Sequence, residues 1–208
     1  MEPLLPLFPL DVVLFPEMFL PLHIFEERYK SMIGECIQEK APFGVVYAHD
    51  ETIELIGCVA DISKIVKRYP DGRLDILAFG IERFQILDLN SDRDYLRGTV
   101  AVLHDSETAV EPSAQSIQHA LELFEEAYRL LNRAEPEHLD TQSSSGLAFR
   151  IASVLYLPNP VKQSILTAQS EDERLTLLTL HMEKLIPQVK EAEKASARAR
   201  SNGNLRHG

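Results

Sequence analysis

The sequence contains residue types that carry enzyme chemistry, but their spacing matches none of the common catalytic or metal-binding motifs. None of its nine glycines precedes a lysine, so the phosphate-binding P-loop is absent. The G-x-S-x-G nucleophile elbow, the H-E-x-x-H zinc motif and the C-x-x-C pair are absent as well. The seven histidines are scattered, and no two have the spacing that would place both on one face of a helix. We therefore predict no catalytic residues, no metal site, no cofactor and a protein that is not an enzyme.

Two cysteines and one histidine remain as isolated candidates. Cys36 and Cys58 lie in apolar patterns, which predicts buried, reduced thiols rather than a redox pair. His23 lies where an extended segment gives way to a helical pattern. We interpret it as a structural histidine that bonds the backbone at the helix start, with a functional role as the alternative. We interpret Glu27 and Arg28 as a structural ion pair or part of a solvated face rather than as a functional site.

A proline-containing loop is the candidate for binding. Phe15, Met18 and Phe19 crowd around the turn Pro16-Glu17, where packing all three side chains inward is difficult. An exposed apolar patch typically marks an interaction surface, and the flexible methionine side chain adapts to varied partners. We therefore predict a peptide-binding site at Phe15, Met18 and Phe19. The alternative is that Phe15 and Phe19 are core residues at strand ends.

Composition restricts the class of protein. Of the 208 residues, 45% are hydrophobic and 25% charged, as in an ordinary globular domain. Charge or proline breaks every apolar run before the roughly 20 residues that a membrane-spanning helix needs. The N-terminus begins with an acidic Glu2 and is rich in proline, which argues against a cleaved signal peptide. We therefore predict a cytoplasmic protein that does not bind membranes.

The charge balance argues against nucleic acid as a partner. The net charge is −11, and such a chain repels a polyanion unless it concentrates basic residues on one face. One local basic cluster contains Lys64, Lys67, Arg68 and Arg73. Tyr69 is the one aromatic residue within it and no glycine cradle accompanies it, so we interpret it as a solvated face rather than a polyanion site.

The first half of the chain has the pattern of short strands. The predicted strands cover residues 4–7, 12–14, 19–22, 43–47, 55–59, 62–68, 74–79, 84–89 and 97–103. Prolines punctuate the first three and should forbid central-strand pairing at those points. One helical pattern interrupts this half, with apolar residues at positions 25, 29, 32, 36 and 37. Tight turns such as Pro70-Asp71-Gly72-Arg73 predict a sheet that curls toward a barrel.

The second half has the pattern of helices. Apolar stripes run through 117–131, 147–155, 161–166 and 175–189. We expect Asn159 as the N-cap of the third helix, a capping box at residues 170–173 and a kink at Pro187. The predicted domains are therefore a β-rich lobe with one helix at 1–110, a helical lobe at 111–200 and a disordered tail at 201–208.

Several separated blocks of the first half occur in an order specific to one known family. The blocks are LPLFPL (5–10), VLFP (13–16), LPLHIFEERY (20–29), FGVV (43–46), IGCVA (56–60), PDGR (70–73) and GIERF (80–84). They resemble the N-terminal substrate-binding domain of Lon-type proteases, and the following helices resemble the helical lobe of that family more loosely. Glu17 stands where the family commonly has glycine, and Glu26 where it commonly has proline. Both departures concern loop shape rather than the fold.

The resemblance implies both a fold and a function. The fold is α+β: a curled, mostly antiparallel PUA-like pseudo-barrel precedes a helical bundle that ends in a long helix. In full-length Lon proteases an ATPase motor and a Ser–Lys protease follow this region, and because the sequence ends at Gly208 we expect a stand-alone form without them. The implied function is non-catalytic recognition of unfolded or partly folded polypeptides through their exposed apolar segments. A protease or chaperone component is a further expected partner.

Other functions stay open. The main alternative is a protein–protein adaptor with one dedicated folded partner. An RNA-binding module rests on analogy with the PUA-like fold alone, and the acidic charge opposes it. A hydrolase has no motif behind it. Weak binding to several unrelated unfolded proteins would favour a recognition module, and one tight partner would favour an adaptor.

Overall fold

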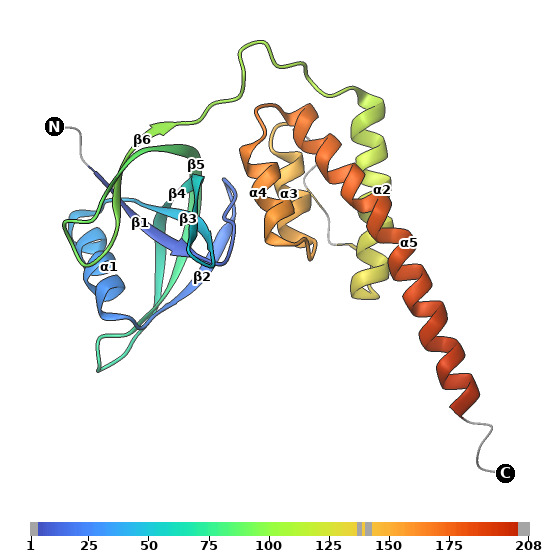
Figure 1. Ribbon diagram of the computed structural model, residues 1–208, viewed down its shortest axis with the longest axis horizontal. Helices are drawn as coiled ribbons and strands as arrows, with labels where there is room; N and C mark the ends of the chain where they lie inside the picture. The colour runs from blue at the N-terminus through green and yellow to red at the C-terminus, as the bar shows by residue number, and fades with distance from the viewer. Residues whose placement is uncertain (1–3, 137–138, 140–142, 204–208) are drawn as a thin grey trace. The chain divides into compact units, whose positions relative to one another are not determined.

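The structure, a computed structural model, describes residues 4–136, 139 and 143–203 (Figure 1). The chain forms two compact units. Unit 1 combines Met1–Ser106 with Pro158–Gln169, and unit 2 combines Glu107–Leu157 with Ser170–Gly208. The domain boundaries predicted from the sequence, 1–110, 111–200 and 201–208, stay predictions. The last helix runs through Gly203, and residues 204–208 of the predicted tail lie outside the described residues.

Unit 1 is built on a mixed sheet of six strands (Figure 1). The strands are β1 (Leu5–Leu10), β2 (Phe19–Ile24), β3 (Phe43–His49), β4 (Thr52–Arg68), β5 (Leu74–Asn90) and β6 (Arg97–Val102). Their order is β2-β5-β4-β3-β1-β6; β1 and β3 are parallel and the other pairs are antiparallel. Because β6 pairs with both β1 and β5, all strands except β2 close into a ring. The predicted curled, mostly antiparallel sheet is confirmed.

Two strands are longer than predicted. β4 and β5 have 17 residues each, where the sequence pattern predicted two short strands in each case. Bulges interrupt the pairing of β4 with β5, so the chain bends without leaving the sheet. The early part of β5 pairs with β2 and its late part with β6. The predicted strand at 12–14 is wrong: this segment is a loop, and it is apolar because Leu14 is buried.

The prolines of β1 and β2 were predicted to interrupt strand pairing, but they do not. Pro6 pairs with Arg97, Pro9 lies opposite Val46, and Pro21 pairs with Leu77. A ladder uses the N–H groups of alternate residues only, so a proline fits where its missing N–H would point away from the partner strand.

One helix supplies the core of the curled sheet. Helix α1 (Glu27–Glu39) buries four side chains, Tyr29, Met32, Ile33 and Cys36. They pack in one cluster with sheet residues that include Phe8, Ile24, Phe43, Ala60, Ile76 and Ala78. Phe25, which was predicted to share this stripe, lies before the helix and is 59% exposed.

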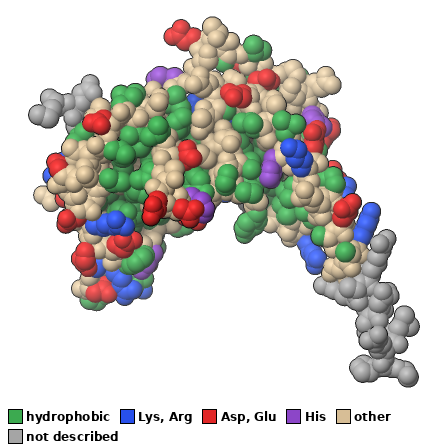
Figure 2. All heavy atoms as spheres, in the orientation of Figure 1, with side chains coloured by type: hydrophobic (Ala, Val, Ile, Leu, Met, Phe, Trp, Pro, Cys, Tyr) green, Lys and Arg blue, Asp and Glu red, His purple; other side chains and the backbone are tan. Residues whose placement is uncertain are grey.

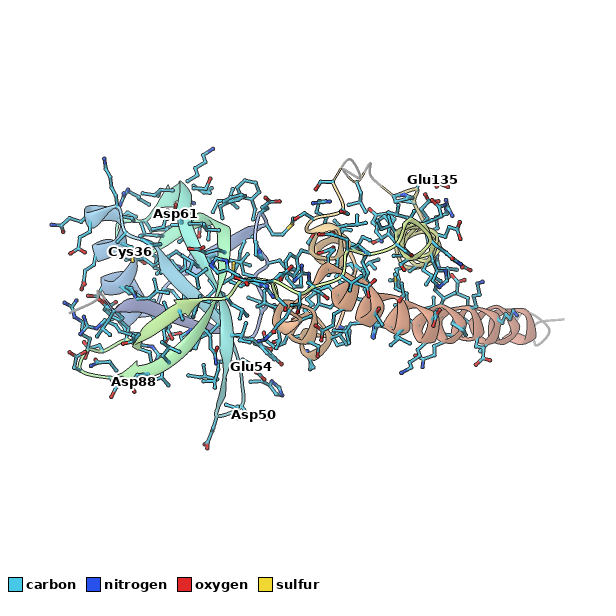
Figure 3. All side chains as sticks on the ribbon, turned by 90° about the horizontal axis from the view of Figure 1, so that it is seen from above. Cys36, Asp50, Glu54, Asp61, Asp88 and Glu135 are labelled. Carbon is cyan, nitrogen blue, oxygen red and sulfur yellow. The ribbon has the colours of Figure 1, made fainter. Side chains whose placement is uncertain are left out.

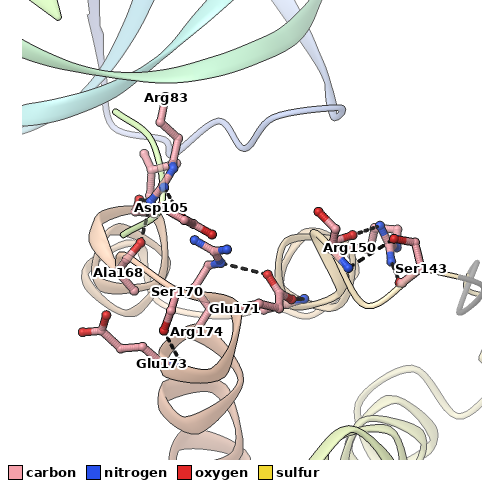
Figure 4. Close-up of polar contacts among 12 residues, drawn as sticks. Arg83, Asp105, Ser143, Arg150, Ala168, Ser170, Glu171, Glu173 and Arg174 are labelled. Carbon is pink, nitrogen blue, oxygen red and sulfur yellow. Dashed lines mark hydrogen bonds and ion pairs between the residues drawn. The ribbon is translucent and has the colours of Figure 1, made fainter. Parts of the chain in front are cut away.

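Helix α4 (Asn159–Thr167) belongs to unit 1 although it follows the helices of unit 2 in sequence. Gln163 is buried and donates its amide to the carbonyl of Ile56 at 2.9 Å. Arg83, also buried, donates to the carbonyls of Leu166 and Ala168 at the end of α4 and pairs with Asp105 (Figure 4).

The start of α4 differs from the prediction. Pro158 is the N-cap, and Asn159 is the first helical residue. The side-chain amide of Asn159 instead donates to the carbonyl of Asp11 at 2.8 Å. Proline at position 160 then suits the first turn, because the N–H groups there have no intrahelical acceptor.

Unit 2 consists of α2 (Ala114–Asn132), α3 (Leu147–Val154) and the long helix α5 (Glu171–Gly203) (Figure 1). The Ser113 side chain caps α2 by accepting from the N–H of Ser116. In α5 the predicted capping serine, Ser170, accepts from the N–H of Glu173 at 3.1 Å. Pro187 lies inside α5, which continues past it. The long final helix and the α+β class are therefore confirmed.

A buried ion pair fastens the first turn of α5 to α3. Glu171 and Arg174 are both buried and lie 2.9 Å apart (Figure 4). The second carboxylate oxygen of Glu171 accepts from the N–H of Ala148 at 2.7 Å. The guanidinium of Arg174 lies over the ring of Phe149. These contacts satisfy both charges, as burial requires.

Candidate functional site

The exposed side chains of β2 form an apolar ridge with those of β5. Alternation along β2 turns Leu20, Leu22 and Ile24 inward and leaves Phe19, Pro21 and His23 exposed. The exposed residues lie opposite Phe79, Leu77 and Asp75 of β5. Four of these six side chains are apolar. We name Phe19, Pro21, Leu77 and Phe79 the β2–β5 face.

An aromatic pair leads the β2–β5 face. Phe19 is 58% exposed, and its ring centroid lies 5.0 Å from that of Phe79 at an interplanar angle of 52°. Phe79 is half-buried. The ring of Phe19 therefore provides most of the solvent-exposed surface of the pair. Tilted ring pairs at this distance are attractive, and an exposed aromatic pair is a typical anchor for a partner side chain. Figure 2 shows that hydrophobic side chains gather over the visible surface of unit 1.

The three residues predicted for binding have different positions in the structure. Phe15 is 2% exposed and is therefore a core residue. Met18 is half-buried and packs against the core cluster. Only Phe19 faces solvent. The structure thus matches the stated alternative for Phe15, and Met18, just before β2, packs inward where Phe19 faces solvent.

A tight turn holds Phe19 in place. The N–H of Met18 donates to the carbonyl of Phe15 at 3.3 Å, across Pro16 and Glu17. Glu17 has a φ of 63°, a conformation that favours glycine. The turn lies against β5, because Glu17 donates to the carbonyl of Gly80 and Gly80 donates to the carbonyl of Met18. A Cβ at Gly80 would lie 2.2 Å from the carbonyl oxygen of Phe15, so only glycine permits this approach.

A polar cluster lies at the other end of the β2–β5 face. Nδ1 of His23 is 2.6 Å from a carboxylate oxygen of Asp75, whose second oxygen accepts from the Tyr69 hydroxyl at 2.8 Å. The hydrogen bonds from His23 and then Tyr69 lower the pKa of Asp75. Lys67 and Arg73 lie over the ring of Tyr69. The prediction that His23 bonds the backbone was wrong, because His23 lies on β2 opposite Asp75.

The remaining candidate residues have structural positions. Arg28 pairs with Glu26 and Glu27 with Lys30, so the two do not pair with each other, but both side chains are exposed, as in the predicted solvated face. Cys36 and Cys58 are buried free thiols, as predicted.

Two kinds of feature are absent from the part of the chain that the structure describes. Within it, no three His, Cys, Asp or Glu side chains come together in a way that could hold a metal ion. Its helices are also too short or too polar to cross a bilayer.

The closed sheet and the helical segments define an α+β fold whose sheet carries the apolar β2–β5 face. A family model for the ATP-dependent protease La (LON) substrate-binding domain matches residues 4–184. The chain therefore belongs to the Lon substrate-binding domain family.

Relatives named Lon protease match most of the chain. A Lon protease of Lawsonia intracellularis is 29% identical over 98% of this chain and 26% of its own length. A Lon protease of Brucella melitensis is 30% identical over 83% of this chain and 23% of its own length. This chain thus spans about a quarter of the curated relatives that it matches.

Two solved structures share the fold. The Lon N-terminal domain protein from Xanthomonas campestris is 25% identical, with a TM-score of 0.66 over 85% of this chain and 96% of that chain. The N-terminal domain of Mycobacterium avium complex Lon protease is 18% identical, with a TM-score of 0.63 over 87% of this chain and 98% of that chain.

Sequence reasoning missed most of the β2–β5 face. Leu77 and Phe79 lie about 60 residues from Phe19 in sequence, and only the register of β2 against β5 brings them together. Alternation along 19–24 was the available signal, since it predicts that Phe19 and Pro21 point to the side opposite Leu20 and Leu22.

Proposed function

We propose that this chain recognises unfolded or partly folded polypeptides through the β2–β5 face. The carrying observation is the exposed ring of Phe19, paired with the half-buried Phe79, in a member of a substrate-binding family. Apolar side chains of an unfolded client are exposed to water, and contact with this ridge buries apolar surface on both partners. A folded client hides such side chains, which provides the discrimination.

The size of the face sets the expected affinity. Full burial of a phenylalanine side chain stabilises by about 1.5–3 kcal/mol, and Phe19 has more than half of its surface left to bury. A ridge of four apolar side chains then supplies only a few kcal/mol before the cost of ordering the client. We expect weak binding of many sequences, strengthened where a client offers several apolar segments.

Catalysis, cellular location and further partners complete the proposed function. We propose that the chain is non-catalytic, that it acts in the cytoplasm, and that a protease or chaperone component acts on the clients it binds. A purified preparation should hydrolyse neither ATP nor an unfolded protein substrate. Turnover that follows the folded protein through a mock-purification control would contradict this.

A binding panel tests the proposal and separates it from the adaptor alternative. Fluorescence anisotropy would measure binding to several unrelated proteins, each as a chemically unfolded, soluble form and as its native form. We expect weak binding to most unfolded forms and none to the native ones. Failure to bind any unfolded form, together with tight capture of one folded partner, would show that the adaptor reading is the correct one.

A further inference from the structure

A second candidate surface lies along the edge of β4 that faces away from β5. β3 pairs with β4 only as far as Ala60, and residues 61–68 have partners on β5 alone. Within the described residues, this stretch of β4 therefore has one unpaired edge. The C-terminal end of α1 lies beside it, and the two elements enclose a groove of about 330 Å³. Cys36 of α1 and Asp61 of β4, both labelled in Figure 3, line this groove.

The floor of the groove is apolar and its rim is mainly cationic. Ile37, Ile62 and Ile65 line it and also pack against the core cluster. Lys40 and Lys64 line it from α1 and β4, with one acidic residue, Asp61. The groove is thus locally basic in a chain whose net charge is −11.

The two rim lysines are available to a ligand. Both are exposed, and neither has an ion-pair partner among the residues that the structure describes. Lys40 is held in place by its backbone, because it is the left-handed C-cap of α1 with a φ of 53° and donates its N–H to Cys36. Glycine would occupy this position at lower cost, so the lysine side chain is not needed for the cap.

We propose that this groove binds an acidic segment of a polypeptide in extended conformation. Alternate side chains of such a segment would place apolar groups on the isoleucine floor and carboxylates against Lys40 and Lys64. The proposal extends the polypeptide recognition proposed above, but it uses a different surface. It adds charge to the selectivity: among clients of equal hydrophobicity, those with acidic residues between the apolar ones bind better.

The shape of the strand determines the kind of contact. Bulges in β4 lie between Ile62 and Lys64 and between Ile65 and Lys67. They break the regular spacing of backbone donors, which protects this edge from continuous strand addition. The segment is therefore held by side-chain contacts and single backbone bonds, not by a new ladder. Such binding is weak and salt-sensitive.

The test uses a fluorescein-labelled eight-residue peptide that alternates leucine and aspartate, with both ends blocked. A matched peptide carries asparagine in place of aspartate. Anisotropy titrations with the full chain should show tighter binding of the aspartate peptide, weakened by added salt. Lys40→Gly and Lys64→Gln should each weaken it about two- to five-fold. Lys40→Gly also relieves the left-handed backbone, so the loss cannot come from destabilisation.

Two further variants complete the test: one should strengthen peptide binding, and the other is a control. Asp61→Asn should strengthen binding of the aspartate peptide, since it removes the one carboxylate of the rim. Lys194→Gln, at an exposed lysine of α5, should change nothing. Equal binding of both peptides, no binding of either, or unchanged binding by Lys40→Gly and Lys64→Gln would each overturn the proposal. Phe19→Ser tests whether the two surfaces act independently. It should leave binding of the aspartate peptide to the groove unchanged, even if the β2–β5 face proves not to bind clients.

Discussion

Replacing Arg83 by methionine should detach α4 from the sheet. The side chain is 5% exposed, and it donates to the carbonyl of Leu166 at 2.8 Å, to the carbonyl of Ala168, and to Asp105. Hydrogen bonds from a charged group contribute about 1.5–3 kcal/mol each. Contacts of one group do not add fully. Because Asp105 is 38% exposed, most of the loss comes from the two carbonyls left without a donor, and we expect about 3–5 kcal/mol in the free energy of unfolding.

Urea titration followed by circular dichroism would measure this loss. Methionine keeps much of the apolar stem, so the change isolates the polar contacts. Arg129→Met is the matched control, because its ion pairs with Glu125 and Glu135 are exposed, and it should leave the unfolding midpoint nearly unchanged. A loss below about 1 kcal/mol for Arg83→Met, within the range of a surface pair, would refute the account of how α4 is held.

Three further predictions concern the core, the turn and the thiols. Leu178 is fully buried, so Leu178→Ala should lower the free energy of unfolding by about 2–5 kcal/mol. Leu180 is 48% exposed, and equal urea midpoints for Leu178→Ala and Leu180→Ala would contradict the packing of α5. Glu17→Gly should keep or raise the melting temperature, because glycine relieves the φ of 63°; a clear drop would show otherwise. Burial raises the pKa of the Cys36 and Cys58 thiols to about 11 and 12, so at pH 8 a thiol reagent should label the unfolded chain only; prompt labelling of the native protein would disagree.

Local patterns predicted the elements well where a turn residue marks a real reversal. Between β4 and β5 the predicted turn is present: the N–H of Tyr69 donates to the carbonyl of Arg73, and Gly72 has a φ of 84°. At Asp61 and Gly80 the same reasoning predicted strand ends, but the chain bends and continues. A bend and a reversal use similar residues, and only pairing with neighbouring strands distinguishes them.

Long-range packing could not be predicted from local pattern. The helical stripe of α4 shows that it buries one face, but nothing in it shows that the face meets β4 rather than the neighbouring helices. Buried Arg83 and Gln163 carry no signal in sequence, because both residue types are usually exposed. The groove beside β4 depends on where β3 stops pairing, at Ala60, which is again a matter of register.

Two serine variants show whether the β2–β5 face binds unfolded polypeptides. Phe19→Ser and Tyr156→Ser each remove an exposed aromatic ring, 58% and 82% exposed respectively, and neither should lower the melting temperature much. Binding of one unfolded protein would be measured for both variants and for the unchanged chain. We expect Phe19→Ser to weaken binding about five- to thirty-fold, the equivalent of about 1–2 kcal/mol, and Tyr156→Ser to bind normally. Normal binding by a folded Phe19→Ser protein would contradict it.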